Sequence, residues 1–292
     1  MTDSAAPAVP DRPARAPRAQ HVLEVIRTER LSPHLVRVHL GGAGTRALLA
    51  EADPERLAST DAYVKLMLPQ PGSGIVPPFD LPALRATLPP EALPAVRTYT
   101  LRHADPATGT AAIDFVVHGD EGLAGPWAAT ARPGDLLAAS GPGGLFQPSA
   151  DPGLARLVVG DDSAVPAIAA ALAAMPADAR GVALIEVDGA GDELPLAHPA
   201  GVEVRWIHRS RTPDAVPGAP LVDAVRALDR PDAEVEVFAH GERGAMKELR
   251  AILQDGWGID RRALSLSAYW ALGRAEDRFQ AEKREPVGAI FA

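Results

Sequence analysis

Residues 96–103 have the sequence VRTYTLRH, which follows a proline-rich run and has the composition of a β-strand. Side chains two residues apart lie on the same face of a strand, so Arg97 and Tyr99 point to one side and Thr100 to the other. An arginine binds anions through a planar fork of donors, and a tyrosine beside it offers a flat ring. The pair therefore suits a ligand with a phosphate and a planar ring, although a surface arginine beside a half-buried tyrosine is the commoner meaning of this spacing.

Short segments with a hydrophobic period of two surround this stretch and indicate a small antiparallel β-barrel of six strands. The predicted strands are HVLEVIRT (21–28), HLVRVHL (34–40), AYVKLML (62–68), AVRTYTL (95–101), AAIDFVVH (111–118) and GDLLAAS (134–140). A run with eight prolines, residues 69–94, interrupts them and is too long for an ordinary hairpin.

The second half of the chain alternates strands with helices, which indicates crossover connections and a parallel sheet. The predicted strands are ARLVVGD (155–161), GVALIEVD (181–188), VEVRWIH (202–208), AEVEVFAHG (233–241) and ALSLSAYW (263–270). The predicted helices are SAVPAIAAALAAM (163–175, with Ser163 as its cap), PLVDAVRAL (220–228) and ERGAMKELRAILQ (242–254).

The length of 292 residues fits about two domains. We predict a disordered tail at 1–20, a barrel domain at 21–145, and an α/β domain at 153–292 that ends in a helical tail. The first twenty residues lack the apolar core of a signal peptide, and no run is long enough for a membrane span, so the cytoplasm is the expected location. A monomer is the default expectation, because nothing in the sequence indicates oligomerisation.

Composition excludes several classes of function. The net charge is −9, from 29 Lys and Arg against 38 Asp and Glu, which argues against nucleic acid or an anionic membrane as the main partner. The chain has no cysteine, so disulfides, thiol nucleophiles and thiolate-held iron–sulfur clusters are excluded. Its eight histidines follow no metal-binding spacing, and we expect no metal site. Redox chemistry would therefore need an organic cofactor.

A glycine-rich segment, HGDEGLAGPWAA at 118–129, joins the end of a strand to the start of a helix. Glycines at such a junction let backbone N–H groups approach a phosphate. A simple glycine-rich turn is the alternative, and the segment is a weak signal by itself.

Taken together, the sequence resembles the siderophore-interacting protein family, the ferric-siderophore reductases built on the ferredoxin-reductase plan. The resemblance covers about residues 21–283. It is carried by YVKLMLP (63–69), RTYTLR (97–102), DFVVHGDEGLAGPWAATARPGDLLAASGPGG (114–144), GDDSAVPAIAAAL (160–172) and SAYWALGRAEDRFQAEK (267–283).

The resemblance implies that the barrel binds FAD. It assigns an FAD phosphate to Arg97, the flavin ring to Tyr99, and the flavin edge to Thr100. The pyrophosphate and adenine side falls to the glycine-rich segment, through His118, Gly119, Gly122, Ala124, Gly125 and Trp127. Here the chain departs from the family, whose usual Gly-Pro-Ala-Ser becomes Gly-Leu-Ala-Gly at 122–125 and loses a hydroxyl.

The resemblance also implies that the α/β domain binds NADPH or NADH at the carboxyl ends of its strands. The implied contacts are Asp161, Ser163, Gly241, Glu242, Tyr269 and Trp270. Arg209 is the candidate for the 2′-phosphate of NADPH, with His208 and Arg211 beside it, and a solvated loop is an equal alternative. No Gly-x-Gly-x-x-Gly fingerprint is present.

For an anionic ferric siderophore, a basic patch beside the flavin is expected. Lys65 matches a basic position of the family, and Arg274 and Lys283 are the other candidates. Two arginines that often follow the Tyr-Trp pair in the family are Ala271 and Leu272 here. The acceptor is therefore the least defined part of the site.

These observations predict a flavoprotein that takes a hydride from NAD(P)H onto FAD and passes single electrons to chelated Fe(III), with no side chain as general acid or base. Two alternatives stay open: a general NAD(P)H-dependent flavin or quinone reductase, and a non-catalytic siderophore-binding protein.

Overall fold

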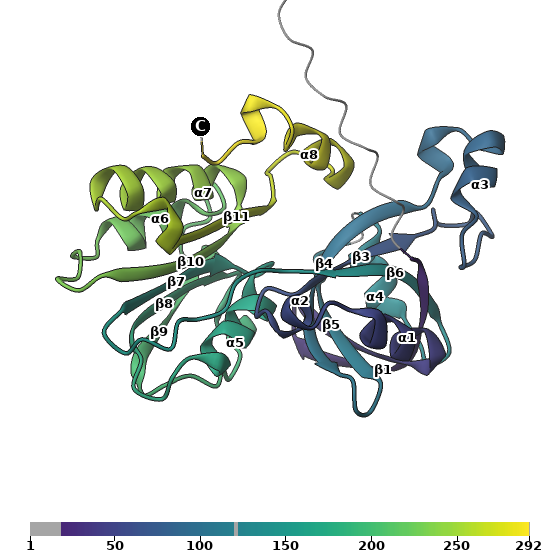
Figure 1. Cartoon of the computed structure of the whole chain (residues 1–292). Coiled ribbons are helices and arrows are strands. Elements are labelled where there is room, and N and C mark those ends of the chain that lie inside the picture. Colours follow the sequence, from purple (N-terminus) through teal and green to yellow (C-terminus); the bar gives the residue numbers. More distant parts are fainter. Residues whose placement is uncertain (1–18, 120–121, 292) are drawn as a thin grey trace, which may run out of the picture.

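The chain forms two domains side by side in a computed structural model that describes residues 19–119 and 122–291 (Figure 1). The first is a closed antiparallel barrel with the strand order β1-β2-β5-β4-β3-β6. Its strands are β1 (His21–Ser32), β2 (Leu35–Gly41), β3 (Tyr63–Leu68), β4 (Ala95–Asp105), β5 (Thr110–Val116) and β6 (Leu136–Gly143). The six-stranded barrel predicted from the sequence is confirmed, whereas the predicted disordered tail lies, apart from Ala19 and Gln20, outside the described residues.

Side chains along the strands alternate between the barrel core and its outer surface. Val64 and Leu66 of β3 are fully buried, whereas Lys65 between them is only half-buried and faces outward. Phe115 of β5 is the largest apolar side chain of this core, and the rings of Tyr99 and Trp127 pack on it at centroid distances of 4.5 and 5.6 Å.

Short helices cover the barrel and occupy its connections. They are α1 (Gly42–Glu51), α2 (Pro54–Ala58), α3 (Leu81–Thr87), the 3₁₀ turn η1 (Pro90–Ala92) and α4 (Ala124–Thr130). The proline-rich run at 69–94 thus contains helix α3, and Asp80 caps it by accepting a hydrogen bond from the Ala83 N–H. Gln20 exchanges two hydrogen bonds with the Phe79 backbone and ties this run to the start of β1.

The second domain is a parallel five-stranded sheet with the order β11-β10-β7-β8-β9. Its strands are β7 (Ala155–Asp161), β8 (Arg180–Val187), β9 (Gly201–His208), β10 (Val235–Glu242) and β11 (Leu264–Trp270). Its helices are α5 (Val165–Ala174), α6 (Ala219–Arg226), α7 (Arg243–Arg250) and α8 (Glu276–Glu282). Its shorter turns are η2 (Ala190–Asp192), η3 (Arg209–Arg211), η4 (Ala251–Gly256), η5 (Arg261–Ala263) and η6 (Pro286–Gly288). The predicted parallel α/β domain is confirmed.

Helices cover both faces of this sheet. Leu157 and Val159 of β7 pack with α6 and α7, whereas Val158 between them packs with α5 on the opposite face (Figure 1). Helix α5 also contacts β4 of the barrel, and α8 returns to β4 from the far end of the chain. None of the described helices is long and apolar enough to cross a membrane.

Two local predictions were wrong. Ser163 does not cap α5: the cap position is Ala164, and the Ser163 hydroxyl donates to the Asp161 carboxylate instead. The helix predicted over 242–254 is α-helical only to Arg250, because residues 251–256 form a wider π-helical turn.

The linker between the domains is fixed by a buried arginine. The guanidinium of Arg156 on β7 donates to Glu236 on β10 at 2.7 Å and to the carbonyl groups of Ser149 and Asp151 at 2.8 and 2.6 Å. Glu236 in turn accepts a hydrogen bond from the Ser149 N–H at 3.0 Å. These bonds hold the linker against the beginnings of β7 and β10.

We predict that Arg156→Met lowers the free energy of unfolding by about 3 kcal/mol, because it leaves a carboxylate and two carbonyl groups without their donor. The matched control is Arg205→Met, which breaks an exposed ion pair with Glu203 and should cost less than about 1 kcal/mol. Urea unfolding followed by circular dichroism measures both, and equal losses in the two variants would contradict the role given to Arg156.

Candidate functional site

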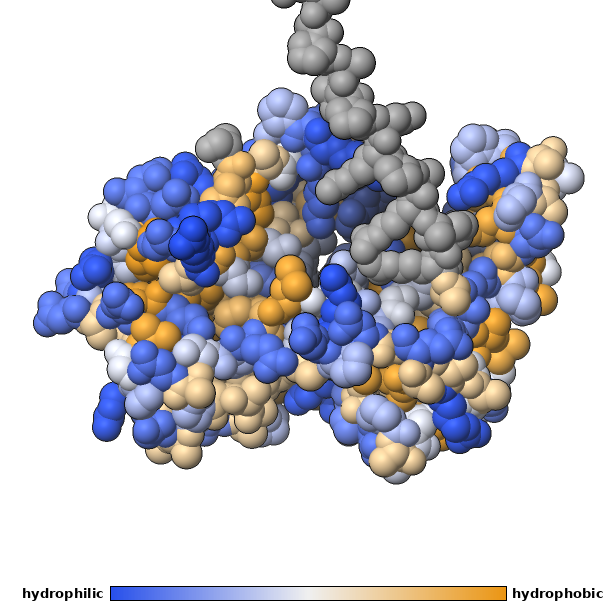
Figure 2. All heavy atoms as spheres, viewed as in Figure 1, coloured by the Kyte–Doolittle hydropathy of each residue, from blue (hydrophilic) through white to orange (hydrophobic). Residues whose placement is uncertain are grey.

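A cleft of about 1510 Å³ lies between the barrel and the carboxyl ends of the parallel strands. The space-filling view shows the surface hollowed between the two domains, with hydrophilic and hydrophobic residues intermingled around it (Figure 2). Most residues predicted for the site line this cleft. They are Lys65, Arg97, Tyr99, Thr100, His118, Gly122, Ala124, Gly125, Ser163, Arg209, Tyr269, Trp270, Arg274 and Lys283.

Arg97 lies on β4 with its side chain 15% exposed. It donates to both carboxylate oxygens of Asp277 on α8, at 3.0 and 3.3 Å, and to the Val96 carbonyl at 2.9 Å. An arginine would hold a phosphate in the same bidentate geometry. An anionic ligand would therefore have to displace Asp277 or share the guanidinium with it.

Tyr99 and Thr100 follow on the same strand with opposite orientations. The Tyr99 ring packs on Phe115 and has its other edge toward the cleft, and burial together with the nearby Glu276 carboxylate raises the pKa of its hydroxyl. Thr100 is buried, and its side chain lies next to the Tyr269 hydroxyl of the other domain. Arg97 and Tyr99 thus share one face of β4, as the alternation predicts.

The glycine-rich segment forms the part of the wall beside this strand. Gly119 and Gly122 have positive φ angles of 56° and 79°, and a side chain at either would meet open space. Gly125 lies against the Val116 carbonyl, which a Cβ would approach to 3.1 Å. The Leu123 side chain does not cap α4, and the first residues of the helix, Ala124 and Gly125, line the cleft. Trp127 packs behind them on Phe115.

Asp161 lies behind the wall of the cleft and is 2% exposed. Its carboxylate accepts hydrogen bonds from the N–H groups of Ser163 and Glu242, at 3.0 and 2.8 Å, and from the Trp270 indole at 2.8 Å. Burial and the adjacent Asp162 charge raise the pKa of Asp161, against the effect of these hydrogen bonds. Its role in the structure is to join the carboxyl ends of three neighbouring strands.

Gly241 and Glu242 also lie behind the wall. A Cβ at Gly241 would come within 2.6 Å of the Asp161 carboxylate, so the glycine allows that close approach. Glu242 caps α7 by accepting from the Ala245 N–H at 2.9 Å, and it holds the next loop through the Leu272 N–H at 3.1 Å. Both positions shape the wall of the cleft formed by the second domain from behind.

Arg209 borders the cleft but is already paired. Its guanidinium donates to the Asp162 carboxylate at 2.5 Å and lies 3.6 Å from Glu186, which is fully buried. The carboxylates raise the pKa of Arg209, although burial acts in the opposite direction. Two negative charges therefore offset the cation that was predicted to hold a 2′-phosphate.

Sequence reasoning missed His240, which is buried next to Tyr269. Its two ring nitrogens lie 2.9 Å from the Tyr269 hydroxyl and 3.1 Å from the Ser265 hydroxyl. Burial lowers the pKa of His240 to about 3, so its ring is neutral at neutral pH. The sequence shows only a histidine inside a buried strand. Such a histidine is usually an ordinary core residue, so nothing in the sequence singles it out.

The cations predicted for the acceptor side gather between β3 and α8. Lys65 and Lys283 line the same part of the cleft. Burial by the cleft walls and the Lys65 charge lower the pKa of Lys283, whereas the Glu276 carboxylate raises it. Lys283 as a whole residue is nevertheless exposed. The two ammonium groups are thus close enough to repel each other.

Arg274 is held by a buried carboxylate. Glu282 accepts hydrogen bonds from Arg243 at 2.6 Å and from Arg274 and Arg278 at 2.9 Å each. These three guanidinium groups lower the pKa of Glu282 to about 2. Arg274 therefore reaches the cleft as part of an ion-pair cluster that fixes α8.

Comparison with known proteins matches both halves of the chain. Residues 24–146 match the model of the siderophore-interacting FAD-binding domain, and residues 155–273 match that of the siderophore-interacting protein. An uncharacterized protein of Mycobacterium tuberculosis is 43% identical over 282 residues, covering 92% of this chain and 96% of that protein. The ferric vibriobactin reductase ViuB of Vibrio cholerae is 32% identical over 274 residues, with the same two shares.

Solved structures of other proteins also match the chain. The siderophore-interacting protein SipS of Aeromonas hydrophila has a TM-score of 0.75 at 31% identity, over 93% of this chain and 99% of that one. The ferredoxin reductase of carbazole 1,9a-dioxygenase, at 16% identity and a TM-score of 0.59 over 88% of this chain and 71% of that one, shares the fold alone. The predicted ferredoxin-reductase-like fold is confirmed, and the chain belongs to the siderophore-interacting protein family.

Proposed function

We propose that the protein is an NAD(P)H-dependent ferric-siderophore reductase with FAD as its cofactor. The observation that carries the proposal is a single cleft that joins the face of β4 with Arg97 and Tyr99 to the carboxyl ends of the parallel strands. Two dinucleotides that must exchange a hydride need such a shared space. The ferric vibriobactin reductase among the relatives supports reduction of a chelated Fe(III).

The barrel wall fits an FAD. The guanidinium of Arg97 is the donor for a phosphate, and the open glycine positions with the uncapped start of α4 leave room for the pyrophosphate. Tyr99, fixed by Phe115, offers its ring to the flavin. Bound FAD supplies the conversion of a two-electron hydride into single electrons.

On the other wall, Ser163 and Trp270 border the space proposed for the nicotinamide, and Asp161 fixes both of them from behind. Tyr269 borders the same space and is oriented by His240. These residues position the donor and exclude water, and none of them has to donate or accept a proton in the electron transfer. On the acceptor side, Lys65 and Lys283 offer the positive charge that an anionic chelate needs.

The reaction itself is tested by anaerobic absorption spectroscopy. The purified protein should be yellow, lose its flavin absorption on addition of NAD(P)H, and recover it on addition of a ferric siderophore with one electron passed per iron. Recovery with a quinone but not with the ferric chelate would favour the general reductase. A colourless protein that binds the chelate would favour the sequestering function.

Flavin retention should depend on Arg97. Loss of a bidentate phosphate partner costs on the order of 2–4 kcal/mol, so Arg97→Ala should bind FAD roughly 30- to 700-fold more weakly and purify largely colourless. The matched control is Asp277→Asn, which removes the same ion pair but keeps the guanidinium, and it should bind FAD at least as tightly as the wild type. FAD titration of the apoprotein decides, and native-like affinity in Arg97→Ala would reject the clamp.

The pairing of Arg209 predicts that NADH is used at least as well as NADPH, because Asp162 and Glu186 already offset the cation. Asp162→Asn should release Arg209 and raise the ratio of kcat/KM for NADPH over NADH about tenfold, the size of one charge-assisted contact. Asp178→Asn, an exposed carboxylate away from the cleft, controls for the change in net charge. If the ratio of kcat/KM for NADPH over NADH were the same in Asp162→Asn and Asp178→Asn, Arg209 would have no part in choosing between the two donors.

Lys65 should act on the chelate alone. Lys65→Ala should raise KM for an anionic ferric siderophore severalfold and leave NAD(P)H-driven flavin reduction unchanged, and added salt should narrow the difference from wild type. Arg85→Ala, which removes an exposed cation of α3 outside the cleft, is the control. Stopped-flow measurement separates the half-reactions, and equal reoxidation rates at subsaturating chelate in the two variants would assign Lys65 to the solvated surface.

A further inference from the structure

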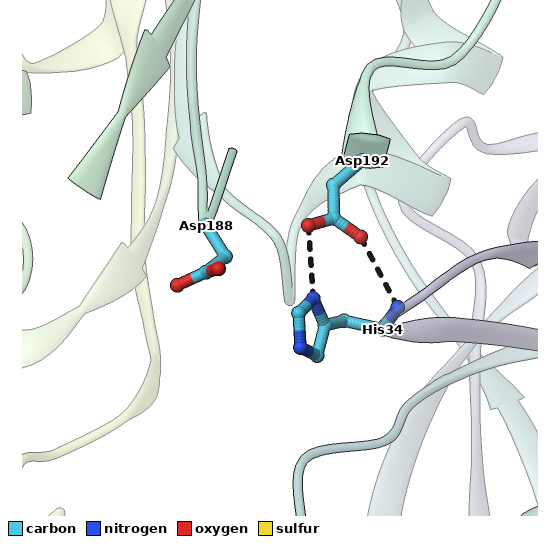
Figure 3. Close-up of side chains that lie close together, drawn as sticks. All are labelled: His34, Asp188 and Asp192. Atoms are coloured by element: carbon cyan, nitrogen blue, oxygen red, sulfur yellow. Dashed lines mark hydrogen bonds and ion pairs between the residues drawn. The ribbon is translucent and has the colours of Figure 1, made fainter. Parts of the chain in front are cut away.

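Three potential metal ligands meet where the two domains touch. His34 lies in the turn between β1 and β2 of the barrel, Asp188 directly follows β8, and Asp192 ends the turn η2 (Figure 3). One ligand atom from each lies within 4.8 Å of the others. The close-up shows the His34 ring between the two carboxylates, bonded to Asp192, with Asp188 on its open side (Figure 3).

Asp192 and His34 are fixed relative to each other. The His34 ring Nδ1 lies 2.9 Å from Asp192 Oδ2, and Asp192 Oδ1 accepts from the His34 N–H at 3.1 Å and from the Ser32 hydroxyl at 2.8 Å. Asp192 is 8% exposed, so its position is set by these bonds. The two side chains are therefore held beside each other before a third partner arrives.

The site is also reachable. His34 and Asp188 line the same cleft as the residues proposed for FAD and the chelate, so an ion in that cleft can approach them without passing through the protein. Asp188 is exposed, and its carboxylate makes no hydrogen bond or ion pair with the described residues. It is therefore available as a ligand.

The donor set has the chemistry of a divalent transition-metal site. One imidazole and two carboxylates suit Fe(II), Mn(II) and Zn(II), and they offset both charges of the ion. Ligands at about 2.1 Å from a metal, at right angles to each other, are about 3 Å apart. The 2.9 Å between His34 Nδ1 and Asp192 Oδ2 matches that separation, with a metal in place of the shared proton.

We infer that His34, Asp188 and Asp192 form a binding site for a divalent transition-metal ion, with Fe(II) released from the reduced chelate as its occupant. The choice of Fe(II) rests on the proposed function, whereas the site itself rests on the three side chains. Binding displaces the proton between His34 and Asp192 to solvent or to the other ring nitrogen, and the oxidation state of the metal does not change. The same residues without a metal would be only a hydrogen-bonded contact between the domains.

The first test is a titration of the FAD-loaded protein with Mn(II), followed by the electron paramagnetic resonance signal of the free ion. We expect one saturable site per chain. Asp188→Asn should weaken it at least about tenfold, because even the loss of an outer partner costs metal sites 10- to 100-fold. His34→Asn, which retains a donor for Asp192 but lacks the imidazole, should weaken it similarly. Asp178→Asn, with the same change of charge, should bind as the wild type does.

The second test replaces Mn(II) by Fe(II) under anaerobic conditions, with a colorimetric Fe(II) chelator as competitor. Wild type should retain one Fe(II) per chain against a chelator concentration that strips Asp188→Asn. Metal binding that is absent, or equal in wild type and Asp188→Asn, would overturn the inference. Fe(II) binding without reduction of the ferric chelate would instead reject the proposed function and leave the site standing.

Discussion

The geometry of the cleft depends on the buried carboxylate of Asp161. A carboxylate without water is costly unless donors replace its hydration, and here four donors from three strand ends do so. This arrangement requires a glycine at position 241, because the side chain of any other residue there would collide with the carboxylate. The contact fixes Ser163 and Trp270 at the cleft, so the wall facing the barrel is rigid although it is built from segments more than 80 residues apart.

Hydrophobic periods were sufficient to predict both domains, because alternation and buried runs are local properties of a sequence. The roles of Asp161, Gly241 and Glu242 were not predictable in the same way. Each stands where a strand ends and a helix begins, which is the position expected of a residue that contacts a ligand. Whether such a side chain faces the cleft or turns inward is decided by donors on other strands, here the Glu242 N–H and the Trp270 indole. That information is absent from a local pattern.

The return of α8 to the barrel was unpredictable for a related reason. Its contact with the barrel is ionic, through Asp277 to Arg97, and ion pairs give no hydrophobic signal, whereas Phe279 packs the helix on Ala268 and Ala271 of its own domain. Ordinary charged residues near the end of a chain are usually solvated. Only the three-dimensional arrangement shows that Glu282 is 2% exposed and surrounded by three arginines, and that the arginine expected to hold a phosphate already holds a carboxylate.

Charge pairing is therefore shared by three arginines of this cleft. Arg97, Arg209 and Arg274 all reach it, and each is bonded to a carboxylate of the same chain. Such pairing orients the guanidinium groups in advance and reduces the repulsion among them. It also means that an anionic ligand gains less than the number of arginines suggests, because it competes with an internal anion. Lys65 and Lys283 differ, since they lie near each other and one lowers the pKa of the other. An anion placed between them would relieve that repulsion, so the two lysines make this end of the cleft attractive to negative charge.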